Sequence, residues 1–312
     1  MSTPTSTRRR LLAFAAALAL PPLRTRAETP PVLLGTSTAG GGFALYGETL
    51  ERILNRRSGR ALVRTQRTRG TAENLVLLRE GKIDAALIQG TAAGELLAQG
   101  PASGLRILFA MYPSAGLLAV PAASSARRLE DLRGRPVVFG VRASGLVTLA
   151  RQVFDGIGLD IERDFEAIYV EQAAQSPRLM IEGRADALWG AGEGWPGFVQ
   201  VAQAPGGARF IGPAREQIPR ILARHPLLQA MDVPAGTYPG IEVPLPSVGS
   251  VNWILAREDL DEARAGAFVE ALHAAAAELA AALPQAAFST LANTLASAPS
   301  PELLHPVLRR PR

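Results

Sequence analysis

The sequence predicts an α/β protein built from two similar lobes, and two observations predict it. Short apolar runs alternate with amphipathic segments along residues 32–189, the order expected of parallel strands joined by helices. In addition, the string Glu80–Ala85 recurs as Glu182–Ala187, and glycine-rich loops begin at Gly35 and Gly140. Both pairs have nearly the same separation along the chain. The matched spacing indicates that one α/β unit occurs twice.

The elements of the first lobe come before residue 90. Apolar runs predict strands at 32–34, 61–65 and 84–89. The loop 35–42 is expected to open a helix with apolar residues on one face. Thr71 is expected to cap a second helix that has Glu73 in its first turn and ends at Gly81.

The second lobe repeats this order. Strands are predicted at 136–139, 165–170 and 185–189. The loop 140–145 opens a helix that runs to about Gly156, and a short helix is expected over 177–182.

The remaining segments are predicted to connect the lobes. Apolar runs at 107–112 and 116–120 carry the chain across, a run at 247–256 carries it back, and two later helices around 259–282 and 285–296 pack on the first lobe. The proline-containing segment 233–246 is predicted to be an irregular connection, and the tail 299–312 to be poorly ordered. The predicted division is an export signal at 1–27, lobe I at 28–115 plus 251–312, and lobe II at 116–250.

Residues 1–27 have the pattern of a cleavable export signal. Arg8–Arg10 precede the short apolar run Leu11–Leu20, and Thr25–Ala27 offers small residues at a cleavage site before Glu28. A membrane anchor would need about 20 apolar residues, which this run lacks. The arginines also resemble a twin-arginine signal. We therefore expect a periplasmic protein, and the absence of cysteine excludes disulfides and a lipid-modified N-terminal cysteine.

The basic charge of the chain comes from this leader. The formal net charge is +5, and removing the five arginines of residues 1–27 leaves as many basic as acidic residues, 28 of each. With 5% aromatic residues and no basic cluster, nucleic-acid binding is not expected. No later apolar stretch is expected to span a membrane.

The residues do not favour an enzyme. The three histidines His225, His273 and His305 are scattered and there is no cysteine, so no metal site is predicted. Neither glycine-rich loop is a nucleotide-binding motif, and no Gly-x-Ser-x-Gly string occurs. No cofactor is expected.

A ligand site is predicted where strands lead into helices. In parallel sheets ligands bind beyond the carboxyl ends of the strands, and a helix N-terminus there favours an anion. The glycine loops at 35–42 and 140–145 have this position, although glycines can also serve only to make a tight turn. Arg142 can pair with a carboxylate or be a solvated loop residue. Gln89 ends a buried strand and is expected to face the cleft.

Four strings resemble a known family. They are Gly35–Gly41, Thr71–Leu75, Leu129–Gly134 and Pro234–Gly240. Together they resemble the solute-binding receptors of tripartite ATP-independent periplasmic (TRAP) transporters, in the TAXI branch. The sequence departs from the family's usual strings at Gln89–Thr91, Ala143–Leu146 and Phe43–Ala44.

The resemblance implies a two-lobed periplasmic-binding-protein fold, type II-like, with crossing strands and a ligand cleft between the lobes. It implies a monomer that binds a small polar solute, such as a carboxylate or amino acid, and delivers it to a membrane permease. A sensor for a signalling partner and an exported enzyme are the alternatives. The candidate ligand-binding residues are Thr36, Ser37, Gly41, Thr71, Glu73, Asn74, Gln89, Arg142, Ser144, Gly145, Glu193, Trp195 and Tyr238.

Overall fold

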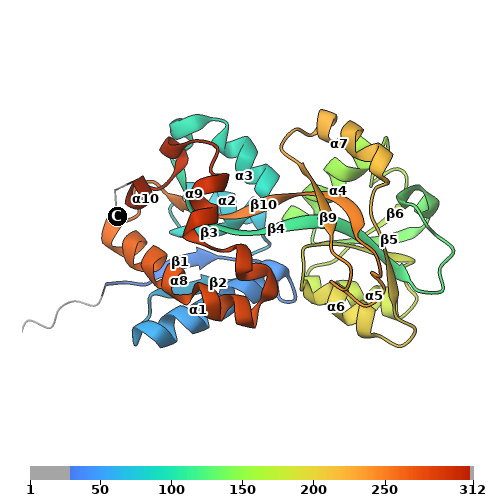
Figure 1. The fold of residues 1–312 in the computed structure, drawn as a ribbon, viewed down its shortest axis with the longest axis horizontal. Coiled ribbons are helices and arrows are strands. Elements are labelled where there is room, and N and C mark those ends of the chain that lie inside the picture. The colour runs from blue at the N-terminus through green and yellow to red at the C-terminus, as the bar shows by residue number, and fades with distance from the viewer. Residues whose placement is uncertain (1–28, 310–312) are drawn as a thin grey trace, which may run out of the picture.

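Two α/β lobes lie side by side and share two long strands (Figure 1). Strands β4 (Leu105–Pro121) and β10 (Leu245–Arg257) run antiparallel from one lobe into the other. The structure is a computed structural model that describes residues 29–309, so the export signal predicted at 1–27 lies outside the described residues. The two extended apolar runs predicted at 107–112 and 116–120 belong to the single strand β4. The predicted lobe boundaries at 115 and 250 fall within these shared strands.

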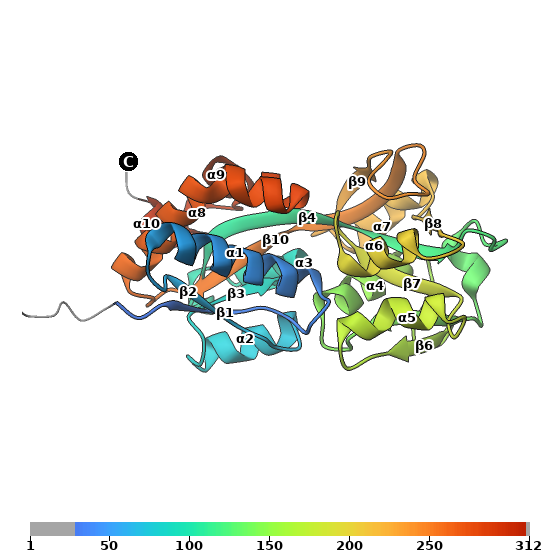
Figure 2. The ribbon, with the colours of Figure 1, turned by 90° about the horizontal axis from the view of Figure 1, so that it is seen from below.

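Lobe I has the strand order β2-β1-β3-β10-β4, with the first three strands parallel. Its own strands are β1 (Val32–Gly35), β2 (Val63–Gln66) and β3 (Ala85–Ile88). Its N-terminal helices are α1 (Gly42–Ser58), α2 (Thr71–Arg79) and α3 (Gly90–Leu97). Figure 2 shows α1 on one face of the sheet and α2 on the other. Each strand therefore leads into a helix at the edge of the sheet that faces lobe II.

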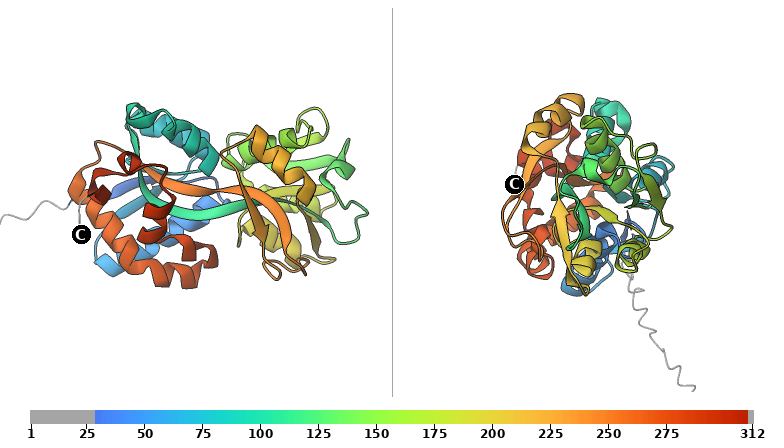
Figure 3. Two further views of the ribbon diagram at one scale, coloured as in Figure 1. Left: turned by 45° about the horizontal axis from the view of Figure 1, so that its top comes forward. Right: turned by 90° about the vertical axis from the view of Figure 1, so that its right-hand side faces the viewer.

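Lobe II repeats this arrangement. Strands β5, β6 and β7 are parallel, and β4 pairs antiparallel with both β7 and β8. The strands are β5 (Pro136–Gly140), β6 (Glu166–Tyr169), β7 (Ala187–Ala191), β8 (Ala208–Ile211) and β9 (Gln229–Val233), and β9 pairs with β10. The helices are α4 (Gly145–Gly156), α5 (Ser176–Ile181), α6 (Pro196–Gln203) and α7 (Ile218–Arg224). Figure 3 shows both shared strands entering this lobe from the side of lobe I.

The repeated string has the same structural role in both lobes. Gly81 and Gly183 have φ angles of 67° and 71°, the left-handed conformation in which glycine ends a helix without strain. Three residues later, the amides of Asp84 and Asp186 donate to carbonyls at the start of the neighbouring strand, at 3.0 and 2.8 Å. The predicted duplication is thereby confirmed.

Thr71 does not cap helix α2, in contrast to the prediction. The capping position belongs to Gly70, whose φ of 105° suits glycine alone. Thr71 is the first helical residue, and its hydroxyl oxygen accepts a hydrogen bond from the Gln89 amide at 3.1 Å. Thr71 thus ties the start of α2 to the end of β3.

The C-terminal residues complete lobe I. Helices α8 (Glu262–Ala282) and α9 (Leu291–Ser297) pack on its core as predicted. The expectation of a poorly ordered tail is wrong for residues 300–309. They contain helix α10 (Pro306–Arg309) and bury Leu303, Leu304 and Leu308 against the core, because the prolines begin short helical turns there.

Helix α8 is, by length and composition, apolar enough to cross a membrane, which corrects the sequence-based expectation for this part of the chain. In the described structure this helix buries one of its faces. Its face formed by Ala265, Phe268, Val269, Leu272 and Leu279 is buried in the core of lobe I.

The buried tail predicts a pH dependence of stability. His305 is fully buried, with its Nε2 atom unpaired, and burial lowers its pKa from the usual 6.5; Arg309 and Arg106 lower it further, whereas Glu262 and Glu258 oppose the shift. The folded protein thus keeps His305 neutral while the unfolded chain takes up a proton below about pH 6.5.

We therefore expect the free energy of unfolding to fall as the pH decreases from 7.5 to 5.5. Urea unfolding at both pH values measures this, and His305→Phe should reduce the difference. An equally large difference in the variant would show that other groups cause it.

Candidate functional site

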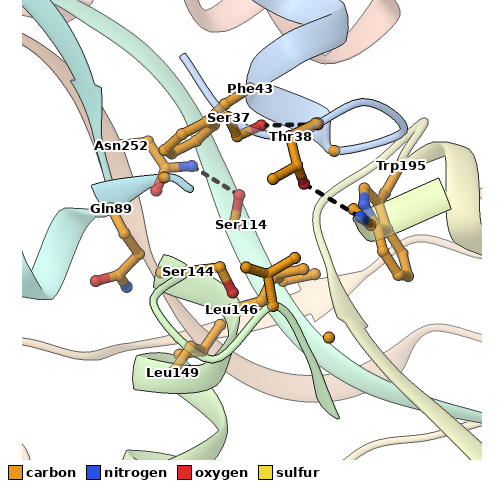
Figure 4. Close-up of a pocket in the computed structure, with 18 of the residues that line it drawn as sticks. Ser37, Thr38, Phe43, Gln89, Ser114, Ser144, Leu146, Leu149, Trp195 and Asn252 are labelled. Atoms are coloured by element: carbon orange, nitrogen blue, oxygen red, sulfur yellow. Dashed lines mark hydrogen bonds between the residues drawn. The ribbon is translucent and has the colours of Figure 1, made fainter. Parts of the chain in front are cut away.

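A cavity of about 80 Å³ lies between the lobes, where strands of both lobes lead into helices. This is several times the space that one water molecule needs. Figure 4 shows Ser37, Thr38 and Phe43 of lobe I facing Ser144, Leu146 and Leu149 of lobe II across it. The site thus lies where the strand-to-helix loops of the two lobes meet.

The start of helix α1 forms the lobe I side of the cavity. The Ser37 hydroxyl oxygen accepts a hydrogen bond from the Ala44 amide at 3.0 Å, which satisfies one amide of the first turn. Gly41 precedes the helix, and Gly41, Gly42 and Phe43 line the cavity. The positive end of the α1 dipole is therefore directed at any ligand held there.

The start of helix α4 forms the opposite side. Ser144 occupies the capping position, but its hydroxyl makes no hydrogen bond, and Gly145 begins the helix. The first amides of α4 have no intrahelical acceptors. Two helix N-termini, one from each lobe, therefore meet at the cavity.

Three buried polar atoms on the lobe II side lack a hydrogen-bond partner among the described residues. They are the hydroxyls of Ser144 and Ser176 and the indole Nε1 of Trp195. Ser176 is fully buried and Trp195 is 4% exposed. Because an unpaired buried polar group costs about 1–3 kcal/mol, these atoms are a set of donors that a ligand can satisfy.

Tyr238 holds Trp195 in place. Its hydroxyl donates to the carbonyl of Gly192 at 2.7 Å and accepts from the Trp195 amide at 2.9 Å. Burial raises the pKa of Tyr238, so the hydroxyl stays protonated. The structure thus places Tyr238 behind the cavity wall as a positioning residue.

The arginine that lines the cavity is Arg69, whereas the sequence suggested Arg142. The Arg142 guanidinium lies outside the cavity, 3.0 Å from Glu162 and stacked 3.7 Å from the centre of the Tyr169 ring. The Tyr169 hydroxyl and two arginines lower the pKa of Glu162, which keeps this ion pair charged. Arg69 lines the cavity instead; it is exposed, and its side chain has no ion-pair partner within residues 29–309. Arg69 is therefore the charged lining residue with which a ligand can pair.

Six of the thirteen predicted site residues line the cavity: Ser37, Gly41, Gln89, Ser144, Gly145 and Trp195. Gln89 also caps helix α3, because its side-chain oxygen accepts from the amides of Thr91 and Ala92. Its Nε2 donates to the Ser250 hydroxyl at 3.0 Å. The Gln89 side chain is therefore held rigidly before any ligand arrives.

The other predicted residues are placed outside the cavity lining. Asn74 donates to the carbonyls of Thr36 and Leu87 and so joins the ends of β1 and β3. The Thr36 hydroxyl donates to the Gln66 carbonyl, and Glu73 accepts from the Arg69 amide at 2.7 Å. These residues, with Thr71, hold the loop that contains Arg69. Glu193, by contrast, lines a separate groove on the far side of the shared strands.

Sequence reasoning missed Arg69, Ser176, Tyr112, Ser114 and Asn252, which all line the cavity. Asn252 donates to the Ser114 hydroxyl at 2.7 Å and to the Tyr112 carbonyl at 3.1 Å. These three residues sit on the shared strands and form the floor. The sequence contains a signal for Tyr112, Ser114 and Asn252, because they are polar residues in or beside the apolar runs that are predicted to cross between the lobes.

The lobes touch around the cavity. The Ala72 amide donates to the Ala143 carbonyl, and the Ala174 amide donates to the Ala39 carbonyl. The Ala173 amide donates to the Thr38 hydroxyl oxygen at 3.1 Å. The lobes are therefore in a closed arrangement, in which the chain before α1 and at the start of α2 contacts lobe II.

Two glycines make this contact possible. A methyl group at Gly40 would lie 2.6 Å from the backbone of Ala174, and one at Gly145 would lie 2.4 Å from the Cβ of Gln89. These distances are shorter than any normal carbon contact. These two glycines therefore let the loops of the two lobes approach each other closely.

Two α/β lobes, two shared antiparallel strands and an interlobe cavity define the fold of type II periplasmic solute-binding proteins. Residues 34–309 match the NMT1-like family, and the chain belongs to that family.

Solved structures share the fold at low sequence identity. One described as a periplasmic transporter is 11% identical with a TM-score of 0.56, and the match covers 83% of this chain and 88% of that chain. A binding-protein component of a phosphonate ABC transporter from Pseudomonas aeruginosa is 15% identical with a TM-score of 0.53, covering 83% and 79%. A weaker similarity, with a TM-score of 0.48, is to the alkanesulfonate-binding protein from Xanthomonas axonopodis, which is 17% identical, with 87% of this chain and 84% of that chain covered.

Proposed function

We propose that this protein is an extracytoplasmic receptor that binds a small anionic solute, a carboxylate, and delivers it to a TRAP-type permease of the TAXI kind. The observation that carries the proposal is the interlobe cavity with the unpaired Arg69, two helix N-termini and three buried unpaired polar atoms. These groups favour a negative charge with oxygen acceptors. The four family strings and the predicted export signal support the transporter type and the periplasmic location.

The mechanism is hinge closure around the solute. Strands β4 and β10 are the only described connections between the lobes that run continuously through both, and their pairing has a register shift between Val251 and Trp253. Such an irregularity is a natural place for bending. A solute that contacts both lobes binds the closed form more tightly and shifts the population toward it. The permease would then recognise the closed protein.

The cavity supports binding rather than catalysis. Its lining consists of hydroxyls, amides, hydrocarbon and one guanidinium, a set that can hold an anion without acting as a general base. Hydrogen bonds in the closed cavity would provide selectivity, since an unmatched polar group there is costly.

The test is to identify what the purified protein carries. Mass spectrometry of the molecule released on denaturation should find a small carboxylate. Adding it back at a hundredfold excess over its dissociation constant should stabilise the protein by about 3 kcal/mol, visible as a raised melting temperature. Small-angle scattering should show compaction on binding. Recovery of a chemically altered compound after incubation would indicate an enzyme, and a cationic ligand would contradict the anion assignment.

A further inference from the structure

The charge of the cavity restricts the solute to a single anionic group. Among the residues that line the cavity, Arg69 is the one charged residue; it is exposed and has no ion-pair partner within residues 29–309. A single guanidinium forms a bidentate pair with one carboxylate. A second carboxylate on the ligand would have no second guanidinium to pair with and would lose its hydration on entering the cavity, which is unfavourable.

The same lining argues against an amino group on the ligand. An ammonium group needs a carboxylate or several free carbonyl acceptors when it leaves water. No aspartate or glutamate is among the residues that line the cavity. In addition, the ammonium would be buried near the guanidinium of Arg69 and the positive ends of two helix dipoles. Amino acids, which the sequence left open, are therefore poor ligands for this cavity.

The unpaired atoms fit the oxygens of a carboxylate. Trp195 Nε1 can only donate, and the hydroxyls of Ser176 and Ser144 can each donate one hydrogen bond. The benzo edge of Trp195 packs against Gly190 and Gly197, and a methyl group at Gly42 would lie 3.5 Å from its Cδ1. The indole edge that carries Nε1 therefore faces the start of α1, where the anion is expected.

One part of the wall is hydrocarbon. Phe43 from lobe I and Val141, Leu146 and Leu149 from lobe II line the cavity, and Figure 4 shows the side chains of Phe43, Leu146 and Leu149 around it. A ligand part that contacts these side chains gains by being apolar. A polar part there would lose its hydrogen bonds to water without replacement.

We infer that the solute is a small monocarboxylate with a hydrocarbon chain and no amino group. This inference rests on the proposed function and specifies which class of carboxylate the receptor binds. The carboxylate pairs with Arg69 and accepts hydrogen bonds from Ser176 and Trp195, and the chain packs against Phe43 and the leucines of α4.

The test uses four five-carbon compounds and the wild-type protein. Isothermal titration at pH 7.5 compares pentanoate with norvaline, which adds an ammonium, glutarate, which adds a carboxylate, and pentanamide, which removes the charge. Pentanoate should bind at least tenfold more tightly than each of the other three. Equal or tighter binding of norvaline or glutarate would overturn the inference, as would no detectable binding of pentanoate.

A variant tests the buried hydroxyl. Ser176→Ala removes an unpaired buried group, so the melting temperature of the ligand-free protein should stay the same or rise. The affinity for pentanoate should nevertheless fall about fivefold or more. An unchanged affinity would contradict the role of Ser176. Release of a different small molecule from the purified protein, such as a dicarboxylate, would overturn this inference while leaving the receptor function intact.

Discussion

Gly145→Ala is expected to lower the affinity for the solute at least hundredfold while leaving both lobes folded. Gly145 begins helix α4 with an ordinary helical backbone, so alanine suits the position and should slightly stabilise the helix. The added methyl group would lie 2.4 Å from the Cβ of Gln89 in the other lobe. Gln89 cannot move away easily, because its side chain caps α3 and bonds to Ser250.

The lobes of this variant must therefore stay apart, and a solute can contact only one of them. A hundredfold loss corresponds to about 2.7 kcal/mol, less than the contacts of a whole lobe are expected to contribute. Calorimetry measures the affinity, and small-angle scattering measures whether ligand still compacts the protein. Gly266→Ala in helix α8 is the matched control, because a methyl group there would meet Val307 of the same lobe, at 3.3 Å, and nothing of the other lobe. Normal compaction of Gly145→Ala with ligand would show that closure tolerates the methyl group.

Arg69→Ala is expected to lower the affinity for a carboxylate at least tenfold, whereas Arg142→Ala should leave it nearly unchanged. Arg69 is exposed at the cavity and has no ion pair among the described residues, so its removal costs the folded protein little. A charge-assisted hydrogen bond to a ligand contributes about 1.5–3 kcal/mol, which exceeds a tenfold change in affinity.

The two arginines make a matched pair, since each lies in a loop that leads into a helix of its lobe. The Arg142 guanidinium is held by Glu162 and Tyr169 outside the cavity. Titration of pentanoate into both variants compares them directly, with melting temperatures as the control for folding. The reverse outcome, a loss of binding in Arg142→Ala alone, would favour the sequence-based assignment over the structural one.

The fold could be predicted further than the site because strands and helices depend on local patterns. Short apolar runs and amphipathic segments located the parallel strands of both lobes and most of the helices that follow them, and the repeated Glu-Gly string marked the equivalence of the lobes. The tail was misjudged, because its prolines suggested disorder, while Leu304 pairs with Ile107 of β4 and Leu308 packs on a core built from distant segments of the chain.

The candidate site depends on which loops meet across the lobes, and local patterns do not contain that information. The rule that ligands bind beyond strand ends placed the cavity at the correct loops. It could not distinguish Arg142 from Arg69, because the difference is made by Glu162, which lies twenty residues after Arg142. Likewise, Asn74 and Thr71 are polar residues beside the cavity whose hydrogen bonds are used to join strands and helices within lobe I.

The route of the chain through the lobes has a consequence for the order of synthesis. Lobe II is formed largely by one continuous stretch between β4 and β10, so it can begin to fold while the ribosome is still adding residues. Lobe I cannot. Its sheet lacks β10 until residue 257 is made, and its core lacks Leu304, which pairs with Ile107 of β4, until residue 304 is made. The first strands of lobe I are synthesised before lobe II, yet lobe I can complete its sheet and core only after lobe II has been synthesised.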